Sequence, residues 1–216
     1  MTITEPLAEK KRGHARDAER TRAGILAAAV HEFAAHGFSG ASVNEVASRA
    51  NINKRMIYHY FGNKEGLYLA VLEEIYDGIR SAERDLELSH LAPEAAVRRL
   101  VLFTFDYFVE HPEFLSLLNT ENMLKARHLQ QSATVRSMHS PFVNMLERIL
   151  ERGTKDGTFR NNVDPVQLYI SVAALGFFYL SNRYTLSTIF ARDLSADSAL
   201  AERREHCAEV ILGYLR

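Results

Sequence analysis

The chain has 216 residues, of which 47% are hydrophobic and 25% charged, and this balance excludes a disordered chain and favours a globular protein of one large or two small domains. The single cysteine, Cys207, excludes a disulfide framework and fits a reducing compartment. The longest apolar run, Leu168 to Leu180, is shorter than the roughly 18 residues of a membrane-spanning helix, and the opening residues lack the apolar segment of a secretory signal. We therefore expect a cytoplasmic protein with no membrane partner.

The formal net charge of −1 conceals an uneven distribution of charge along the chain. Residues 1–64 contain ten lysines and arginines against six acidic residues, whereas residues 65–216 contain sixteen against twenty-one. This asymmetry indicates that the amino-terminal third faces an anionic partner. Residues 1–16 precede any apolar periodicity, and we interpret them as a flexible basic arm that either touches that partner or only aids solubility. Its cations are Lys10, Lys11, Arg12 and Arg16.

Apolar residues recur at intervals of three and four along the chain, and strand-like alternation is absent. This period predicts an all-α fold. The first helix is expected from about Asp17 to His36, with Ile25, Ala29 and Phe33 on its buried stripe. Gly37 supplies the left-handed residue that ends it.

Two short helices are expected next, separated by a tight turn. Ser42 and Glu45 have the spacing of a capping box, which predicts a helix over residues 43–50. In the following turn Asn51 tolerates the left-handed conformation, and Asn53 is suited to cap another helix that starts at Lys54. This arrangement predicts a helix-turn-helix.

The helix that starts at Lys54 has two different faces. At about 100° per residue, Ile57 and Phe61 fall on one side and are expected in the core. The other side gathers cationic, phenolic and imidazole groups, which suit base edges and phosphates in the major groove of duplex DNA. The alternative is a solvated face with no partner. The outward residues are Lys54, Arg55, Tyr58 and His59, with Met56 and Tyr60 at the edges.

A long fourth helix is expected to link this basic unit to the rest of the chain. Asn63 caps it, and its apolar stripe continues to about residue 88. We place the domain boundary near residue 79, which gives a helix-turn-helix domain over residues 17–78 and a helical bundle over residues 79–216. The remaining helices are expected over residues 93–111, 112–129, 140–153, 165–190 and 199–215.

From about Arg20 to Val71 the chain resembles the TetR family of bacterial transcription regulators. The shared pattern is a helix, a glycine followed by an aromatic residue, a Ser-capped short helix, a turn, and then "IYHYFGNK". The chain departs from the family at Asn51, where a turn glycine is common, and at Arg55 and Met56, where small residues are usual; these two leave the operator sequence open. The resemblance implies that DNA is contacted by Ser42, Asn44, Lys54, Arg55, Met56, Tyr58, His59, Tyr60 and Lys64, with Lys64 on phosphate.

The resemblance also implies a homodimer whose carboxy-terminal half binds a small-molecule effector, and therefore a repressor that the effector releases from operator DNA. The sequence supports the dimer independently, because the last helix carries a stripe of Cys207, Ile211 and Leu215 beside Val210 and Tyr214. We expect the last two helices to form the interface. The alternative is that they are simply the core of one chain.

Candidates for the effector site are polar and aromatic groups embedded in apolar helices, since a buried polar atom needs a partner. An inward arginine would suit an anionic effector. Equally, the aromatic residues fit a plain core, the arginines fit surface ion pairs, and His128 fits a hydrogen-bonded helix histidine. The candidates are Phe103, Tyr107, Glu121, Asn122, Arg127, His128, Tyr169, Tyr179, Asn182 and Arg183.

Other functions were weighed against the same residues. An enzyme is disfavoured, because the nine histidines show no HExxH spacing and no glycine-rich phosphate loop is present. We accordingly expect no catalytic residue, metal or cofactor. An activator, or an effector-independent DNA-binding protein, would have the same amino-terminal domain, so the sequence leaves the sign of regulation open. A protein-only interaction module would not depend on the two cations Lys54 and Arg55.

Overall fold

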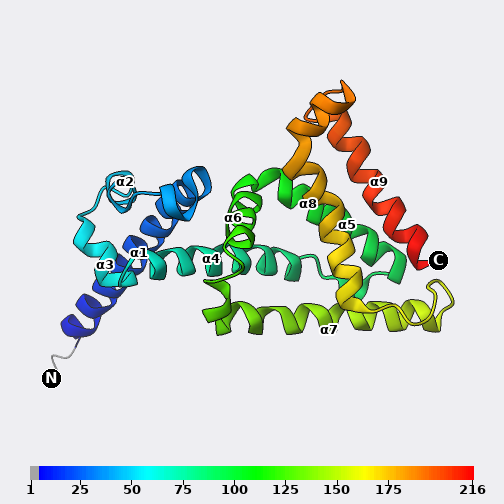
Figure 1. The fold of residues 1–216 in the computed structure, drawn as a ribbon. Coiled ribbons are helices and arrows are strands. Elements are labelled where there is room, and N and C mark those ends of the chain that lie inside the picture. The colour runs from blue at the N-terminus through cyan, green and yellow to red at the C-terminus, as the bar shows by residue number, and fades with distance from the viewer. Residues whose placement is uncertain (1–4) are drawn as a thin grey trace. The chain divides into compact units, whose positions relative to one another are not determined.

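A computed structural model of the chain describes the backbone of residues 5–216 and the side chains of residues 17–216. The described residues form helices and turns, which confirms the expected all-α fold. Figure 1 shows the helices in chain order. They are α1 (Glu5–Gly40), α2 (Val43–Arg49), α3 (Lys54–Phe61), α4 (Lys64–Arg84), α5 (Pro93–Glu110), α6 (Pro112–Met123), α7 (Ala133–Lys155), α8 (Pro165–Phe190) and α9 (Asp197–Leu215), with short 3₁₀ turns η1 (Leu88–His90) and η2 (Leu129–Gln131).

The chain divides into two compact units. The first contains the residues as far as Glu74 together with Leu117–Gln131, and the second contains Ile75–Ser116 and Ser132–Arg216. The division crosses α4 four residues before the boundary expected at residue 79. The sequence pattern did not indicate that the end of α6 and the loop after it belong to the first unit.

The core of the first unit is built on α1. Ile25, Ala29 and Phe33 are fully buried, as their spacing predicts. Gly37 has φ 64° and interrupts the helical geometry, so it ends the regular part of α1 as expected. The helix begins at Glu5 rather than near Asp17, and the backbone of the expected arm is therefore helical from Glu5 onward. The side chains of the basic cluster lie outside the described residues.

The helix after Pro112 is shorter than its apolar pattern suggests. It was expected to continue to Leu129, but α6 ends at Met123. Lys125 and Ala126 both have positive φ angles, 59° and 57°, which an α-helix cannot accommodate. The loop that follows is held instead by the carboxylate of Glu121, which accepts hydrogen bonds from the backbone N–H groups of His128 and Leu129.

In the second unit α5 packs against α7, α8 and α9 (Figure 1). Its inward residues, including Leu100, Phe105 and Phe108, are buried. Close packing also occurs where α7 ends: a Cβ atom on Gly153 would lie 2.1 Å from the ring of Phe159, so only glycine fits there without movement of that ring.

Candidate nucleic-acid interface

The turn between α2 and α3 has the geometry that its asparagines predict. Asn51 adopts a left-handed conformation with φ 52°, and the next N–H, of Ile52, donates to the carbonyl of Ala47 over 3.0 Å. The side chain of Asn53 then accepts the N–H of Arg55 over 2.9 Å and caps α3. Asn63 caps α4 in the same way, through the N–H of Gly66. These local bonds fix the direction in which α3 leaves the turn.

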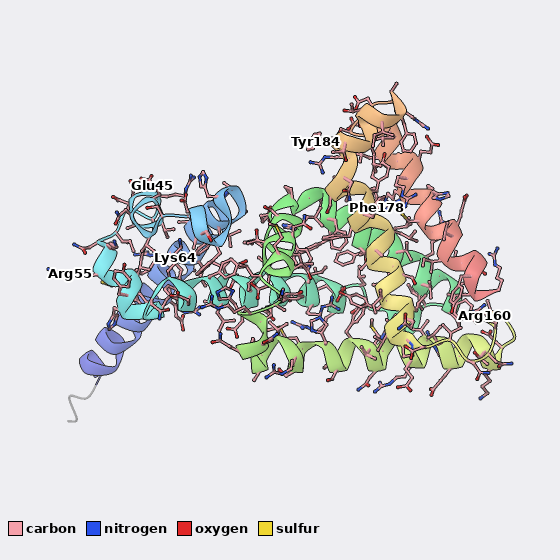
Figure 2. All side chains as sticks on the ribbon, in the orientation of Figure 1. Glu45, Arg55, Lys64, Arg160, Phe178 and Tyr184 are labelled. Atoms are coloured by element: carbon pink, nitrogen blue, oxygen red, sulfur yellow. The ribbon has the colours of Figure 1, made fainter. Side chains whose placement is uncertain are left out.

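The two faces of α3 are those expected from its periodicity. Ile57 has no exposed surface, whereas Tyr58 is 43% exposed. Lys54, Arg55 and His59 are also exposed, and Met56 and Tyr60 are half-buried at the edges. Figure 2 shows Arg55 pointing away from the ribbon of the helix. The expected orientation is thus confirmed, while contact with DNA stays a prediction.

Phe61 departs from the expected burial. Its side chain is only partly covered, and the guanidinium of Arg22 on α1 lies 5.4 Å from the ring centroid. On the outward face the ammonium of Lys54 lies 5.7 Å from the Tyr58 ring, one helical turn away. The helix contains no acidic residue. Its exposed side therefore carries positive charge that its own residues do not neutralise.

The sequence predicted a capping box formed by Ser42 and Glu45 at the start of α2, and this prediction is wrong. Ser42 occupies the N-cap position, but its side chain makes no capping hydrogen bond. Its backbone N–H donates instead to the carboxylate of Glu32 over 2.9 Å, so Glu32 on α1 replaces Glu45. Glu32 is buried and lies seven residues after Ile25, on the same side of α1, which is the signal that sequence reasoning missed. Ser42 is half-buried and Asn44 is exposed.

Lys64, at the start of α4, is held by the backbone of the loop before α2. Its ammonium donates to the carbonyl of Ala41 over 2.6 Å and to that of Ser39 over 3.4 Å, and it lies 5.2 Å from the centroid of the Phe38 ring. Lysine has three donors, so one remains for another acceptor. In this structure the residue ties the start of α4 to the backbone just before α2, a role that the sequence did not indicate.

Four of the ten effector candidates lie in the first unit. Glu121 and His128 form a buried pair, with His128 Nδ1 2.9 Å from Glu121 Oε2. The His128 ring packs against Phe38 and Tyr68, at centroid distances of 4.6 and 4.8 Å. Burial and the nearby Glu121 raise the pKa of Tyr68. The remaining two, Asn122 and Arg127, are exposed, which contradicts their expected place among embedded polar groups.

The other six candidates lie in the second unit, where Tyr107 and Tyr169 are near Arg80 and Glu83. Tyr169 is half-buried and its hydroxyl accepts a hydrogen bond from Arg80 over 2.7 Å. Phe103 and Tyr107 lie one turn apart on α5 with ring centroids 5.7 Å apart. Asn182 and Arg183 donate to carbonyls of their own helix, α8. The structure therefore does not bring the ten together.

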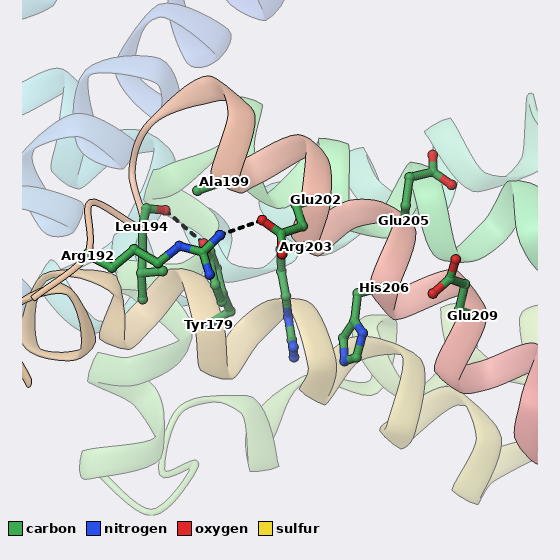
Figure 3. Close-up of a pocket in the computed structure, with 9 residues that line it drawn as sticks. All are labelled: Tyr179, Arg192, Leu194, Ala199, Glu202, Arg203, Glu205, His206 and Glu209. Atoms are coloured by element: carbon green, nitrogen blue, oxygen red, sulfur yellow. Dashed lines mark hydrogen bonds and ion pairs between the residues drawn. The ribbon is translucent and has the colours of Figure 1, made fainter. Parts of the chain in front are cut away.

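Tyr179 lines a hollow of about 500 Å³ between α8 and α9 (Figure 3). Its hydroxyl donates to the carbonyl of Leu194 over 3.0 Å. Arg192 and Glu202 form an ion pair across the hollow at 2.5 Å. Some of the polar groups that line the hollow therefore already bond to one another. Arg192 and Glu202 are both exposed.

The last two helices expose large apolar residues, although the expected stripe itself is not among them. Cys207, Ile211 and Leu215 are buried within the chain itself, so this stripe belongs to the intramolecular core. Burial raises the pKa of the Cys207 thiol. The exposed large apolar residues are Val166, Ile170, Phe178, Tyr184, Ile189 and Phe190 on α8, with Val210 and Tyr214, which the sequence pattern predicted beside that stripe, on α9.

Two family profiles match the chain. The one described as "Bacterial regulatory proteins, tetR family" matches residues 25–71, and "Tetracyclin repressor-like, C-terminal domain" matches residues 93–211. The HTH-type transcriptional repressor NicS of Pseudomonas putida is 41% identical over 202 residues, which cover 94% of this chain and 95% of that protein. The chain belongs to the TetR family.

Further relatives agree with this membership. The HTH-type transcriptional repressor SCO4008 of Streptomyces coelicolor is 40% identical over 109 residues, or 50% of this chain and 53% of that protein. Among solved structures, the regulator SCO4942 of the same species superposes with a TM-score of 0.68 at 23% identity, covering 90% of this chain and 98% of the other. FadR of Bacillus subtilis, solved with stearoyl-CoA, gives 0.64 at 16% identity, covering 89% and 98%. These two structures share the fold of this chain.

The TetR-family chain also contains a buried charged pair that sequence reasoning missed. Arg80 and Glu83 on α4 are each 2% exposed and form an ion pair at 2.7 Å. The available signal was their spacing of three residues on a helix whose apolar stripe includes Ile75 and Ile79. Among the described residues, no helix is long and apolar enough to cross a membrane, and no group of three metal-binding side chains is found.

Proposed function

We propose that this TetR-family chain is a dimeric, ligand-responsive repressor that binds operator DNA through the outward face of α3. The observation that carries the proposal is the division of α3 between a fully buried Ile57 and the exposed Lys54, Arg55 and Tyr58. A helix rooted on one side and cationic on the other fits the major groove, where arginine and lysine donate to guanine.

The residues around α3 would fix its register on the duplex. His59 and Tyr60 on α3, and Ser42 and Asn44 at the start of α2, offer polar groups for phosphate oxygens. Lys64 would use its remaining donor on a phosphate while its other bonds hold the preceding loop. We therefore expect Lys64 to have two roles, one in the shape of the motif and one in salt-dependent affinity.

A second copy of the chain would cover the apolar face of α8 and α9. Eight large apolar side chains are exposed on these two helices, including Phe178 and Tyr184, labelled in Figure 2. Large apolar side chains exposed on two neighbouring helices mark a surface suited to a protein partner. A two-fold dimer would place two α3 helices about 34 Å apart, which matches successive major-groove faces of a near-palindromic operator.

An effector bound in the second unit would release the repressor. The α4 helix is continuous between the two units, so a change in its position would alter the spacing of the two α3 helices in the dimer. The coupling is reciprocal: the effector weakens operator binding by the same factor by which the operator weakens effector binding. The corresponding coupling free energy is typically about 1–3 kcal/mol. Two relatives carry the word repressor in their names, which supports this sign of regulation.

The experiment begins with genome-wide recovery of the DNA fragments that the protein binds. Gel shifts on the recovered operator then follow, with and without candidate effectors. These candidates are the compounds on which the products of the neighbouring genes act. We expect a near-palindromic site, a dimer on each site, and loss of the shift with one class of compound. Equal operator affinity across the whole panel would contradict ligand release. A reporter gene that gains expression from the bound protein would contradict repression.

A further inference from the structure

The interior of the second unit contains the buried pair Arg80 and Glu83, one helical turn apart on α4. Arg80 Nη1 lies 2.7 Å from Glu83 Oε2 as an ion pair. A second nitrogen, Nη2, donates to the hydroxyl of Tyr169 on α8 over 2.7 Å. The guanidinium is thus engaged through both terminal nitrogens, while both charges are removed from water.

Several polar atoms of the pair are not satisfied. Arg80 Nε and Glu83 Oε1 are shielded from solvent and have no hydrogen-bond partner among the described residues. Arg80 Nη1 and Glu83 Oε2 touch as an ion pair, yet they do not meet the geometry of a hydrogen bond. Buried polar atoms in native proteins are almost always bonded, so this group needs a further molecule that offers both an acceptor and a donor.

The surroundings of the pair are aromatic. The Arg80 guanidinium lies 4.3 Å from the centroid of Phe142 on α7 and 5.1 Å from that of Tyr169. Tyr76, one turn before Arg80 on α4, packs edge-on against His139 and Phe114, at centroid distances of 5.5 and 5.7 Å. Because aromatic rings pack well against other flat groups, these surroundings favour a flat ligand.

We infer that Arg80 and Glu83 form the polar centre of the effector site, and that this site takes an uncharged, flat molecule carrying a donor and an acceptor on one group, such as an aromatic carboxamide or a lactam. The inference rests on the proposed function. Its acceptor would take Arg80 Nε–H, and its donor would reach Glu83 Oε1.

The charge of the site favours a neutral ligand over an ion. Above the pKa of Glu83 the pair carries no net charge, so an added anion would face the Glu83 carboxylate and an added cation would face the Arg80 guanidinium, in both cases away from water. Burial raises the pKa of Glu83 to about 7, against the opposing effect of Arg80 and Arg84. Burial lowers the pKa of His139 and raises those of Tyr107 and Tyr169, so these three neighbours are uncharged at neutral pH.

The test uses the full chain and four probes of one shape: benzamide, acetophenone, benzoate and benzylamine. Only benzamide is both neutral and equipped with a donor and an acceptor. The readout is the ¹H–¹⁵N resonance of Arg80 Nε, assigned by its disappearance in Arg80→Lys. We expect benzamide to move this resonance and to bind with a dissociation constant at least tenfold lower than the other three. An unmoved resonance, as for a site completed only by buried water, or equal binding of all four probes, would overturn the inference.

Variants separate this site from general effects. Glu83→Gln and Arg80→Lys should each weaken benzamide at least fivefold in calorimetry, while the same changes at exposed positions of the same unit, Glu87→Gln and Arg84→Lys, leave it unchanged. Circular dichroism verifies that each variant is folded. Unchanged binding in folded Glu83→Gln contradicts the inference. Benzamide binding is measured without DNA and is therefore independent of operator release. If benzamide binds but does not release the operator, the result contradicts the proposed function and does not contradict the inferred site.

Discussion

The α3 helix and the second half of α4 place charge in opposite settings. On α3, Lys54 and Arg55 extend into solvent from a helix without an acidic residue. On α4, Arg80 is enclosed with Glu83 and aromatic rings, with 2% of its surface exposed. An exposed cation costs the fold little and is free to meet a polyanion, whereas a buried one must be compensated inside the protein. The first setting therefore suits binding of DNA, and the second suits selection of a small molecule.

The largest effect is expected from removing the exposed charges. Lys54→Ala with Arg55→Ala should reduce operator affinity by about 4 kcal/mol, or roughly a thousandfold, because each residue would contact a base edge or phosphate. Stability should change by less than about 0.5 kcal/mol, since both side chains are exposed. Fluorescence anisotropy with labelled operator measures the first, and thermal melting the second. The matched control is Arg99→Ala with Arg148→Ala, two exposed arginines of the second unit, which should leave operator affinity nearly unchanged.

Substitution of the buried cation, Arg80, should mainly lower the stability of the chain. Arg80→Met should lower the free energy of unfolding by about 3 kcal/mol, because it leaves Glu83 buried without its partner. Arg84→Met, at an exposed position one residue after Glu83, should change it by less than about 0.5 kcal/mol. Urea unfolding at one fixed protein concentration measures both. Equal stability of the two variants would contradict the enclosed setting of Arg80.

The pH dependence of stability should identify Glu83 itself. Its pKa in the folded chain is about 7, above the ordinary 4.5, so between these values the native state binds a proton that the unfolded chain has released. Stability should therefore fall as pH rises from 5 to 7, by up to about 2 kcal/mol from this residue. His139, with its lowered pKa, acts in the opposite direction. Comparison of the wild type with Glu83→Gln cancels the contribution of His139; parallel pH profiles would show that Glu83 does not titrate in this range.

The smallest expected effect concerns the cap that aims α3. Asn53→Ala should destabilise the chain by about 1 kcal/mol, because the Arg55 N–H loses its acceptor. Asn53→Asp keeps an acceptor and should retain most of that stability. Thermal melting of the two variants side by side is the measurement. Matching losses would mean that the Asn53 side chain does not hold the start of α3.

Sequence periodicity predicted the order of the helices, and on α3 it separated the buried Ile57 from the exposed cations, because local spacing alone decides which side chains share a face. It also located Asn51 and Asn53, whose roles depend on neighbouring backbone atoms. The partners of Ser42 and Lys64 were not predictable in this way. Glu32 reaches Ser42 from ten residues away, and Lys64 reaches Ala41 from twenty-three, and both bonds exist only after α1, α2 and α4 have packed.

The effector candidates show the limit of the same reasoning. A polar residue between apolar ones on a helix can face either way, and Asn122 and Arg127 proved to be exposed. Arg80 was not among the candidates, although its guanidinium lies against rings from α7 and α8. Likewise the stripe of Cys207 is buried within its own chain, and the apolar residues left outside are its neighbours Val210 and Tyr214.

The most direct test of the account is photo-crosslinking to operator DNA from single positions. A photoreactive phenylalanine analogue replaces Tyr58 on α3, which is 43% exposed, or, as the aromatic control, Tyr184 on α8, which is 68% exposed in the single chain and lies in the proposed dimer interface. The account predicts DNA crosslinks from position 58 and none from position 184. Operator-bound protein that crosslinks from position 184 and not from position 58 would contradict it, because DNA would then lie against another surface.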